Sequence, residues 1–194
     1  GVWHAGAPNN LVEGNFVGVN AAGSWVIRHA NIGVELNATP NNTVGGTTAA
    51  ARNILSGNAG AGVFITGAAS TGNLVTGNYI GVNSTGSYSL NNLVGGVGIG
   101  YSPGIMPASG NIIGSGVNKT PGICNGGCNV ISGNAMNGLL LSSSANNLIA
   151  YNHIGVDKNN SSFVGNSGDG VGLIDSPNNT IDNNVINGNN DNGV

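Results

Sequence analysis

Residues 73–83, which read NLVTGNYIGVN, contain the pattern that decides the fold. Asn73 precedes Val75 by two positions, and Asn78 precedes Ile80 by the same step. Side chains alternate along a β-strand with a period of two, so each asparagine faces the same side as the aliphatic residue that follows it. The pattern therefore predicts two short strands whose asparagine and aliphatic side chains both point inward.

The step of three residues from each aliphatic residue to the next asparagine predicts a corner between the strands. A continuous strand would turn the second asparagine outward, so a bend must take up one residue. Glycine adopts the positive φ that such a bend needs, and it often stands directly before that asparagine. Such glycines are Gly14, Gly57, Gly77 and Gly133. Further copies of the Asn-x-(Ile/Val/Leu)-x-x-Asn unit begin at Asn10, Asn53, Asn129, Asn147 and Asn179.

A second unit, in which Gly-(Val/Leu) opens an extended piece, alternates with the first. Its copies begin at Gly1, Gly33, Gly62, Gly96, Gly138, Gly170 and Gly193. The shortest interval, from Gly170 to Asn192, holds three extended pieces, so three strands and three corners make one coil. Longer intervals fit the same coil with residues looped out at a corner, the longest lying between Gly96 and Asn137. Insertions of this kind leave a stacked core untouched.

These repeats predict an all-β fold, a right-handed parallel β-helix of about six coils with insertions at its corners, as a single domain over residues 1–194. Stacking predicts two inward columns. The first consists of Val2, Val34, Val63, Val97, Leu139 and Val171, and the second of His4, Leu36, Ile65, Ile99, Leu141 and Leu173. Asparagines at equivalent corners are expected to form ladders in which each side-chain amide donates to the next coil and satisfies backbone groups left free by the bend.

Two other solenoid folds fit the repeats less well. A left-handed β-helix needs an unbroken six-residue period, which is absent here. A pentapeptide-repeat solenoid needs a five-residue step on all four sides, whereas here that step is repeated only two or three times before the Gly-Val unit interrupts it. The right-handed form fits the repeats best.

Three segments carry a resemblance to a known group of proteins. They are GVFI at residues 62–65, GNYIGV at residues 77–82 and NVISGN at residues 129–134. They resemble the parallel β-helix repeats of bacterial and archaeal surface proteins in the pectate-lyase-like superfamily, which includes carbohydrate-binding and sugar-hydrolase repeats. The resemblance covers essentially the whole chain and implies the fold. It does not select a function, because lyases, hydrolases, adhesins, phage tailspikes and structural rods share this scaffold.

Composition narrows the possible partners. Only 6% of the residues are charged, and four Lys and Arg in total cannot form the basic stripe that tracks a phosphate backbone, so nucleic acid is not an expected partner. No apolar run approaches the roughly 18 residues that cross a bilayer, so membrane insertion is not expected either. The chain has 36 glycines and is rich in asparagine, so amides and hydroxyls rather than charges solvate it.

The two cysteines predict a local disulfide. Cys124 and Cys128 flank Asn-Gly-Gly, whose glycines allow a small ring to close, and the second cysteine pair of a zinc site is missing. A disulfide favours an oxidising setting, so the expected location is extracellular or on the cell surface. The surrounding insertion, residues 101–127, is also a candidate recognition loop.

The search for a chemical site gives one weak candidate. Asp169 and Asp191 lie shortly before a coil-opening glycine on adjacent coils, where such a pair could bind calcium or act as acid and base. Corner positions favour aspartate for its local hydrogen bonds in any case, so no catalytic residue, metal site or cofactor is assigned. Asp157 replaces the asparagine found at Asn20 and Asn83, and it is interpreted first as a ladder or corner residue.

Other residues suggest binding or modification rather than catalysis. The three histidines, His4, His29 and His153, are dispersed over the repeat and do not predict a metal site. Trp3, Phe64 and Tyr79 are candidate outward positions for sugar stacking, although scattered surface aromatics explain them as well. Sequons for N-glycosylation, about as frequent as chance predicts, occur at Asn37, Asn41, Asn83, Asn118, Asn159, Asn160 and Asn178.

The two ends of the sequence fall at the same phase of the repeat. Because a solenoid normally ends in atypical capping segments, an uncapped coil would pair with more coils, either of a longer parent chain or of a second copy stacked end to end. We therefore expect an extracellular structural solenoid that serves as a segment or subunit of a surface fibre or stalk. The alternatives are a glycan-binding adhesin or tailspike-like module, and a polysaccharide lyase or hydrolase.

Overall fold

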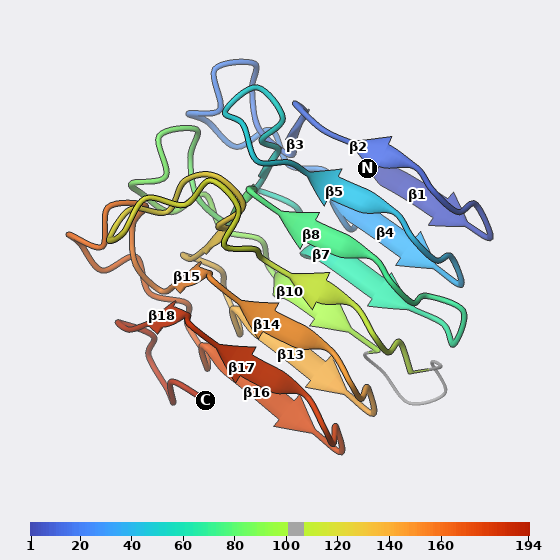
Figure 1. The fold of residues 1–194 in the computed structure, drawn as a ribbon. Helices are drawn as coiled ribbons and strands as arrows, with labels where there is room; N and C mark the ends of the chain where they lie inside the picture. Colours follow the sequence, from blue (N-terminus) through green and yellow to red (C-terminus); the bar gives the residue numbers. More distant parts are fainter. Residues whose placement is uncertain (101–106) are drawn as a thin grey trace.

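The chain folds as a right-handed parallel β-helix of six coils (Figure 1), seen in a computed structural model that describes residues 1–100 and 107–194. Each coil contributes one strand to each of three six-stranded sheets, which we call sheets A, B and C. The first six residues of the candidate recognition loop, 101–106, lie outside the described part. Across the described ranges, no helix is long and apolar enough to cross a bilayer.

The three sheets are built from strands of two to six residues. Sheet A contains β1 (Val2–Ala5), β4 (Val34–Asn37), β7 (Ala61–Thr66), β10 (Gly95–Ile99), β13 (Leu139–Ser142) and β16 (Val171–Ile174). Sheet B contains β2 (Leu11–Val12), β5 (Thr43–Gly45), β8 (Leu74–Thr76), β11 (Ile112–Ile113), β14 (Leu148–Ala150) and β17 (Thr180–Asp182). Sheet C contains β3 (Phe16–Val17), β6 (Ile54–Leu55), β9 (Tyr79–Ile80), β12 (Val130–Ile131), β15 (His153–Ile154) and β18 (Val185–Ile186).

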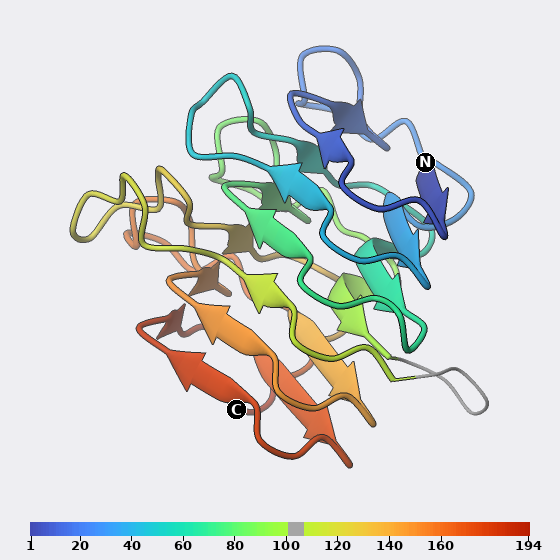
Figure 2. The same ribbon diagram turned by 45° about the vertical axis from the view of Figure 1, so that its right-hand side comes forward.

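The hand of the coil is visible in Figure 2. The chain advances from the N-terminus at the upper right to the C-terminus at the lower left. The strands of sheet B, nearer the viewer, run toward the upper left, while those of sheet A behind them run toward the lower right. This sense of rotation is right-handed, as is usual for crossovers between parallel strands.

Strand pairing confirms both predicted inward columns. In sheet A, Val34 pairs with Val2 on one side and Val63 on the other, and the series continues through Val97 and Leu139 to Val171. The second column runs in the same register from the fourth residue of the chain to Leu173. From Val2 to Val171 in the first column, and from Leu36 to Leu141 in the second, these residues join aliphatic residues of sheets B and C in one continuous core along the axis. Leu173, in the last coil, is 38% exposed.

The predicted asparagine ladders are confirmed at three corners. In each ladder the Nδ2 of one asparagine donates to the Oδ1 of its counterpart in the next coil, over 2.8–3.2 Å. The first ladder is Asn10, Asn42, Asn73, Asn111, Asn147 and Asn179; the second is Asn15, Asn53, Asn78, Asn129, Asn152 and Asn184; and the third is Asn58, Asn92, Asn134, Asn166 and Asn189. All three ladders donate in the same direction, from the N-terminal toward the C-terminal coil.

Odd and even coils differ on the outer side of sheet C. After β3, β9 and β15, the chain forms a short hairpin closed by an antiparallel bridge, and these bridges pair Val19 with Val26, Val82 with Ser89, and Val156 with Phe163. Each hairpin turn is held by one side-chain oxygen, that of Asn20, Asn83 or Asp157, which accepts two backbone N–H groups. Asp157 is therefore a corner residue rather than a ladder residue.

The even coils have a tight corner instead of a hairpin. There a glycine with positive φ follows the strand closely, at Gly57, Gly133 and Gly188. A Cβ atom on each of these glycines would collide with the hairpin of the preceding odd coil, at Val26, Ser89 and Phe163 respectively. Each even corner thus provides the space in which the hairpin of the coil before it rests.

Candidate functional site

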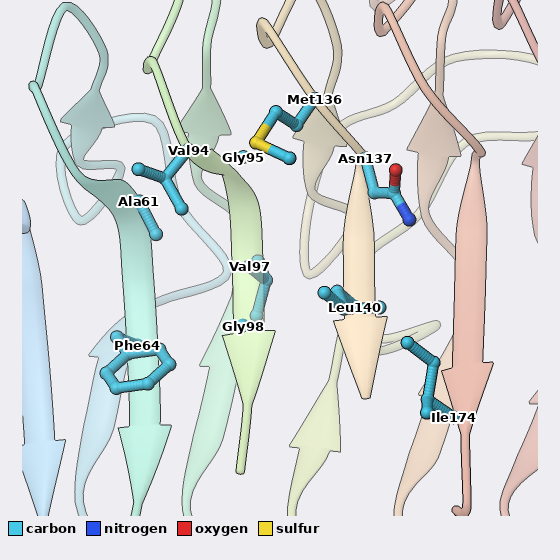
Figure 3. Close-up of a pocket in the computed structure, with 10 residues that line it drawn as sticks. All are labelled: Ala61, Phe64, Val94, Gly95, Val97, Gly98, Met136, Asn137, Leu140 and Ile174. Carbon is cyan, nitrogen blue, oxygen red and sulfur yellow. The ribbon is translucent and has the colours of Figure 1, made fainter. Parts of the chain in front are cut away.

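A groove on the outer face of sheet A is the site with the clearest shape in the described part of the chain (Figure 3). It arises from one outward column, which consists of Trp3, Glu35, Phe64, Gly98, Leu140 and Gly172. Because Gly98 has no side chain, a gap remains between Phe64 and Leu140. A Cβ atom at Gly98 would lie 2.8 Å from Cδ2 of Phe64, so the ring leans over the glycine.

The groove has a volume of about 260 Å³ and is mostly apolar. Its lining comes from β7, β10, β13 and β16 and the turns before them: Ala61, Phe64, Val94, Gly95, Val97, Gly98, Met136, Asn137, Leu140 and Ile174. None of these ten residues carries a titratable side chain. The arrangement can therefore hold an apolar face or ring, with the amide of Asn137 as a polar contact, but its lining supplies no acid, base or nucleophile.

Asp169 lies just beyond the groove, but it is not paired with Asp191. Its Oδ2 accepts a hydrogen bond from Nδ2 of Asn137 at 3.3 Å, and its Oδ1 accepts from Nδ2 of Asn192 at 3.0 Å. Asp191 is instead the counterpart of Gly168 in the next coil, and its backbone N–H donates to the carbonyl of Gly168. Asp169 therefore continues a polar row of amides before sheet A, and its neighbours in the adjacent coils are asparagines rather than a second carboxylate.

His29 and His153 lie in different coils of the solenoid. His29 lies in the first coil, 3.4 Å from the terminal amine of Gly1. Its carbonyl accepts from the N–H of Ala59, as the carbonyl of Asn58 accepts from Leu93, so His29 occupies the position at which later coils carry the third ladder. His153 lies in β15, fully buried. Within residues 1–100 and 107–194, no three His, Cys, Asp or Glu side chains come close enough together to hold a metal ion.

The structure separates the three candidate sugar-stacking aromatics. Trp3 is 68% exposed, and Phe64 is half-buried two coils further along the same outward column of sheet A, with Glu35 between them. Tyr79 points outward from sheet C but is only 2% exposed, because the chain around that sheet covers it. Its ring instead lies 4.2 Å below the guanidinium of Arg52. Placing Tyr79 on an open surface was wrong.

The sequons also differ in accessibility. Asn41, Asn118, Asn159, Asn160 and Asn178 are exposed and Asn37 is half-buried. Asn83 is buried, and its Oδ1 accepts the backbone N–H groups of Ser87 and Tyr88 in the hairpin turn. A glycan on this side chain would have to disrupt the turn.

Cys124 and Cys128 are joined by a disulfide bond in the insertion before β12. Both cysteines are buried, and they belong to a second apolar cluster on the outer side of sheet C, together with Tyr79 and Val130. Sequence reasoning did not foresee this cluster or the groove at Gly98. The signals were present: the motif Gly-Val-(Asn/Asp) recurs at residues 18–20, 81–83 and 155–157, and a glycine interrupts the outward column between two large apolar residues.

The strand pairing, the three amide ladders and the alternating corners define the class of this protein: a right-handed parallel β-solenoid. Comparisons with protein-family models, with curated proteins and with solved structures find no match. The class therefore rests on the structure of the chain itself, and its function has to be argued from the geometry.

Proposed function

We propose that this chain is an extracellular structural β-solenoid, a segment or subunit of a surface fibre or stalk. The observation that carries the proposal is the common polarity of the three asparagine ladders. Each coil presents Nδ2 donors to the coil after it and Oδ1 acceptors to the coil before it. The C-terminal face of one coil, which carries the donors, is therefore complementary to the N-terminal face of another coil of the same kind, which carries the acceptors.

This complementarity favours continued stacking as the means by which the molecule elongates. Parallel strand edges carry unpaired backbone groups, which pair readily with a further strand. Coils that match in ladder positions and apolar columns would satisfy those groups, whether they belong to the same polypeptide or to a second copy placed end to end. At about 4.8 Å per coil, each added set of six coils lengthens the rod by about 29 Å.

Composition and covalent chemistry support the extracellular location. Disulfides persist in oxidising compartments, and the Cys124–Cys128 ring is such a bond. The resemblance of the repeats to those of microbial surface proteins in the pectate-lyase-like superfamily supports the same assignment. A surface solvated by amides and hydroxyls, with 6% charged residues, also suits an inert rod whose shape depends little on salt.

Glycan binding is the second candidate function, and the groove on sheet A favours it. Phe64 offers an aromatic ring to the apolar face of a sugar, while Asn137 and Asp169 place amide and carboxylate groups at the rim. Because the lining has no positive charge, a neutral sugar would fit this groove better than a uronic acid.

Electron microscopy of the purified protein and of the native cell surface tests the structural proposal. Long threads with an axial repeat of about 4.8 Å would support a fibre. Short, discrete rods at all concentrations, together with saturable binding to a neutral glycan on an array, would overturn it in favour of the glycan-binding module. Loss of that binding in Phe64→Ala would place the glycan in the groove.

A further inference from the structure

Two loops form a roof over the outer face of sheet C. They are the insertion at residues 115–128 and the hairpin at residues 156–163, and we refer to them together as the roof. The insertion is fixed at its base by the backbone N–H of Gly77, which donates to the carbonyl of Gly127 at 3.1 Å. It touches the hairpin where the N–H of Cys124 donates to the carbonyl of Lys158 at 2.6 Å. Apolar residues beneath these loops form a cluster separate from the axial core.

His153 is the one titratable imidazole under this roof. It pairs with Val130 and Val185 in sheet C and has no exposed surface. Its Nδ1 lies 3.1 Å from the backbone carbonyl of Asp157 in the hairpin. A carbonyl can only accept, so Nδ1 carries the hydrogen and the neutral ring leaves Nε2 as an acceptor. That Nε2 is buried and has no hydrogen-bond partner among the described residues.

Protonation would be costly at this position. It would place a second N–H on Nε2, for which residues 1–100 and 107–194 supply no hydrogen-bond partner, and would bury a positive charge. The charged groups on the covering elements are Lys119 on the insertion and Asp157 and Lys158 on the hairpin. The Lys119 ammonium lies over the ring of Tyr151, 5.6 Å from its centroid, while the sheet neighbours of His153 are both valines.

The balance of these groups favours the neutral ring. Burial lowers the pKa of His153 most. The hydrogen bond to the Asp157 carbonyl and the Asp157 carboxylate raise this pKa, Lys119 lowers it further, and the net result lies below the usual range of histidine. The closed roof therefore binds a proton less well than an open one, in which the ring meets water.

We propose that His153 is a pH-sensitive latch, and that its protonation releases the roof from sheet C while the three-sheet solenoid stays folded. The proposal does not depend on whether the protein is a fibre or a glycan-binding module. Within the described residues, the buried members of the axial core cluster are all aliphatic, and amide ladders hold its corners, so acid acts on the roof first. Opening would expose the apolar cluster around Val130 and the Cys124–Cys128 ring to solvent.

The sign of the effect follows from proton linkage. The open state takes up its proton near the ordinary histidine pKa of about 6.5, and the closed state only at lower pH. The closed roof is thus most stable above about pH 6.5, and its opening constant rises by up to about tenfold per pH unit below that point. The rise ends once the pH falls below the lowered pKa of the closed state.

Hydrogen exchange resolved by peptide, corrected for intrinsic exchange rates, tests the latch. In the wild-type chain, opening of residues 115–128 and 156–163 should increase by up to about fivefold between pH 6.5 and 5.5, while β7 and β13 stay protected. His153→Val places a third valine beside Val130 and Val185 and should remove this increase. His29→Asn, which supplies the ladder residue missing from the first coil, should keep it.

Two outcomes would overturn the proposal. One is exchange in the roof of the wild-type chain that does not change with pH. The other is an acid response in His153→Val equal to that of the wild type. If His153→Val does not fold, proton NMR of the wild-type imidazole decides the question, because the titration of His153 must coincide with roof opening.

Discussion

Nδ2 of Asn78 lies 3.2 Å from Oδ1 of Asn129, although 51 positions of sequence separate the two residues. The intervening chain contains a hairpin, a strand of each of sheets A and B, and the longest insertion of the solenoid. The ladder bond is nevertheless equivalent to those between coils with short corners. The length of a coil is therefore unimportant to its neighbours, provided that the strands and ladder asparagines return to their positions.

Asn78→Ala should lower the free energy of unfolding by about 3 kcal/mol or more, because buried groups that lose a partner each cost roughly 1–3 kcal/mol. The side chain donates to Asn129 and to the carbonyl of Val44, and it accepts from the Asn53 amide. Denaturant unfolding monitored by circular dichroism measures the loss. Asn10→Ala, in the first and partly exposed rung, should cost less, and equal losses would show that the ladders act only at the surface.

Leu141→Ala and Leu173→Ala compare the same substitution in one column of adjacent coils. Leu141 is fully buried and should lose about 2–5 kcal/mol of stability, the range found for leucine truncation in cores. Leu173 is 38% exposed and should lose about half as much or less. Thermal or denaturant unfolding at low protein concentration distinguishes the two variants. A loss at Leu173 as large as that at Leu141 would mean that another coil covers it in solution.

Gly98→Leu should fill the groove on sheet A. Its φ is not positive, so only space opposes a side chain, and Phe64 must move because a Cβ there meets its ring. We expect a stability loss of about 1–3 kcal/mol from overpacking, together with loss of any ligand that the groove binds. Glycan arrays and calorimetry measure the second effect. Trp3→Ala, in the same outward column but outside the groove, is the control and should retain binding.

Asp157→Asn and Asp157→Ala separate the role of the hairpin oxygen from that of its charge. Burial raises the pKa of Asp157, but hydrogen bonds from Ser161 and Ser162 outweigh it and hold this pKa below its ordinary value. The stability that the carboxylate adds is therefore present above its ordinary pKa of about 3.9 and is lost as the pH falls through the lowered value. The Asp157→Asn variant should keep the hairpin turn at neutral pH, because the side-chain oxygens of Asn20 and Asn83 hold the equivalent turns. It should also abolish this acid dependence.

Urea titrations at pH 7 and pH 3 provide the measurement for these two variants. Asp157→Ala should lose about 1–2 kcal/mol at pH 7, comparable to the loss of a helix N-cap of similar geometry. If Asp157→Asn loses as much stability between pH 7 and pH 3 as the wild type does, the role assigned to the carboxylate is contradicted. This acid effect falls below the pH range of the latch at His153, so the two can be told apart.

Sequence alone was sufficient for the repeating part of the fold. The two-residue step places Asn73 and Val75 on one face, and stacking then forces Val34 over Val2, because a solenoid leaves one neighbour on each side. The inner columns and the ladders could be predicted for this reason. Both depend on phase within the repeat, and that phase can be read directly along the chain.

The outer surface could not be predicted in the same way. Tyr79 was expected on an open face, but residues distant in sequence cover sheet C, and the path of an insertion does not follow from its composition. The groove at Gly98 results from a missing side chain, which a search for chemical groups overlooks. The approximate phase of the repeat predicts Asp191 as the neighbour of Asp169, but a shift of one residue gives it Asn192 instead.

The alternation of hairpins and tight corners makes the outside of this rod different from its inside. Along the inner columns the translational period is one coil, about 4.8 Å, whereas the hairpins recur only at every second coil, about 9.6 Å. The surface therefore repeats every two coils, whereas the core repeats every coil. Removing one coil by deletion would leave the apolar columns continuous but bring two hairpins, or two bare corners, into contact, so such a molecule gains or loses coils most easily in pairs.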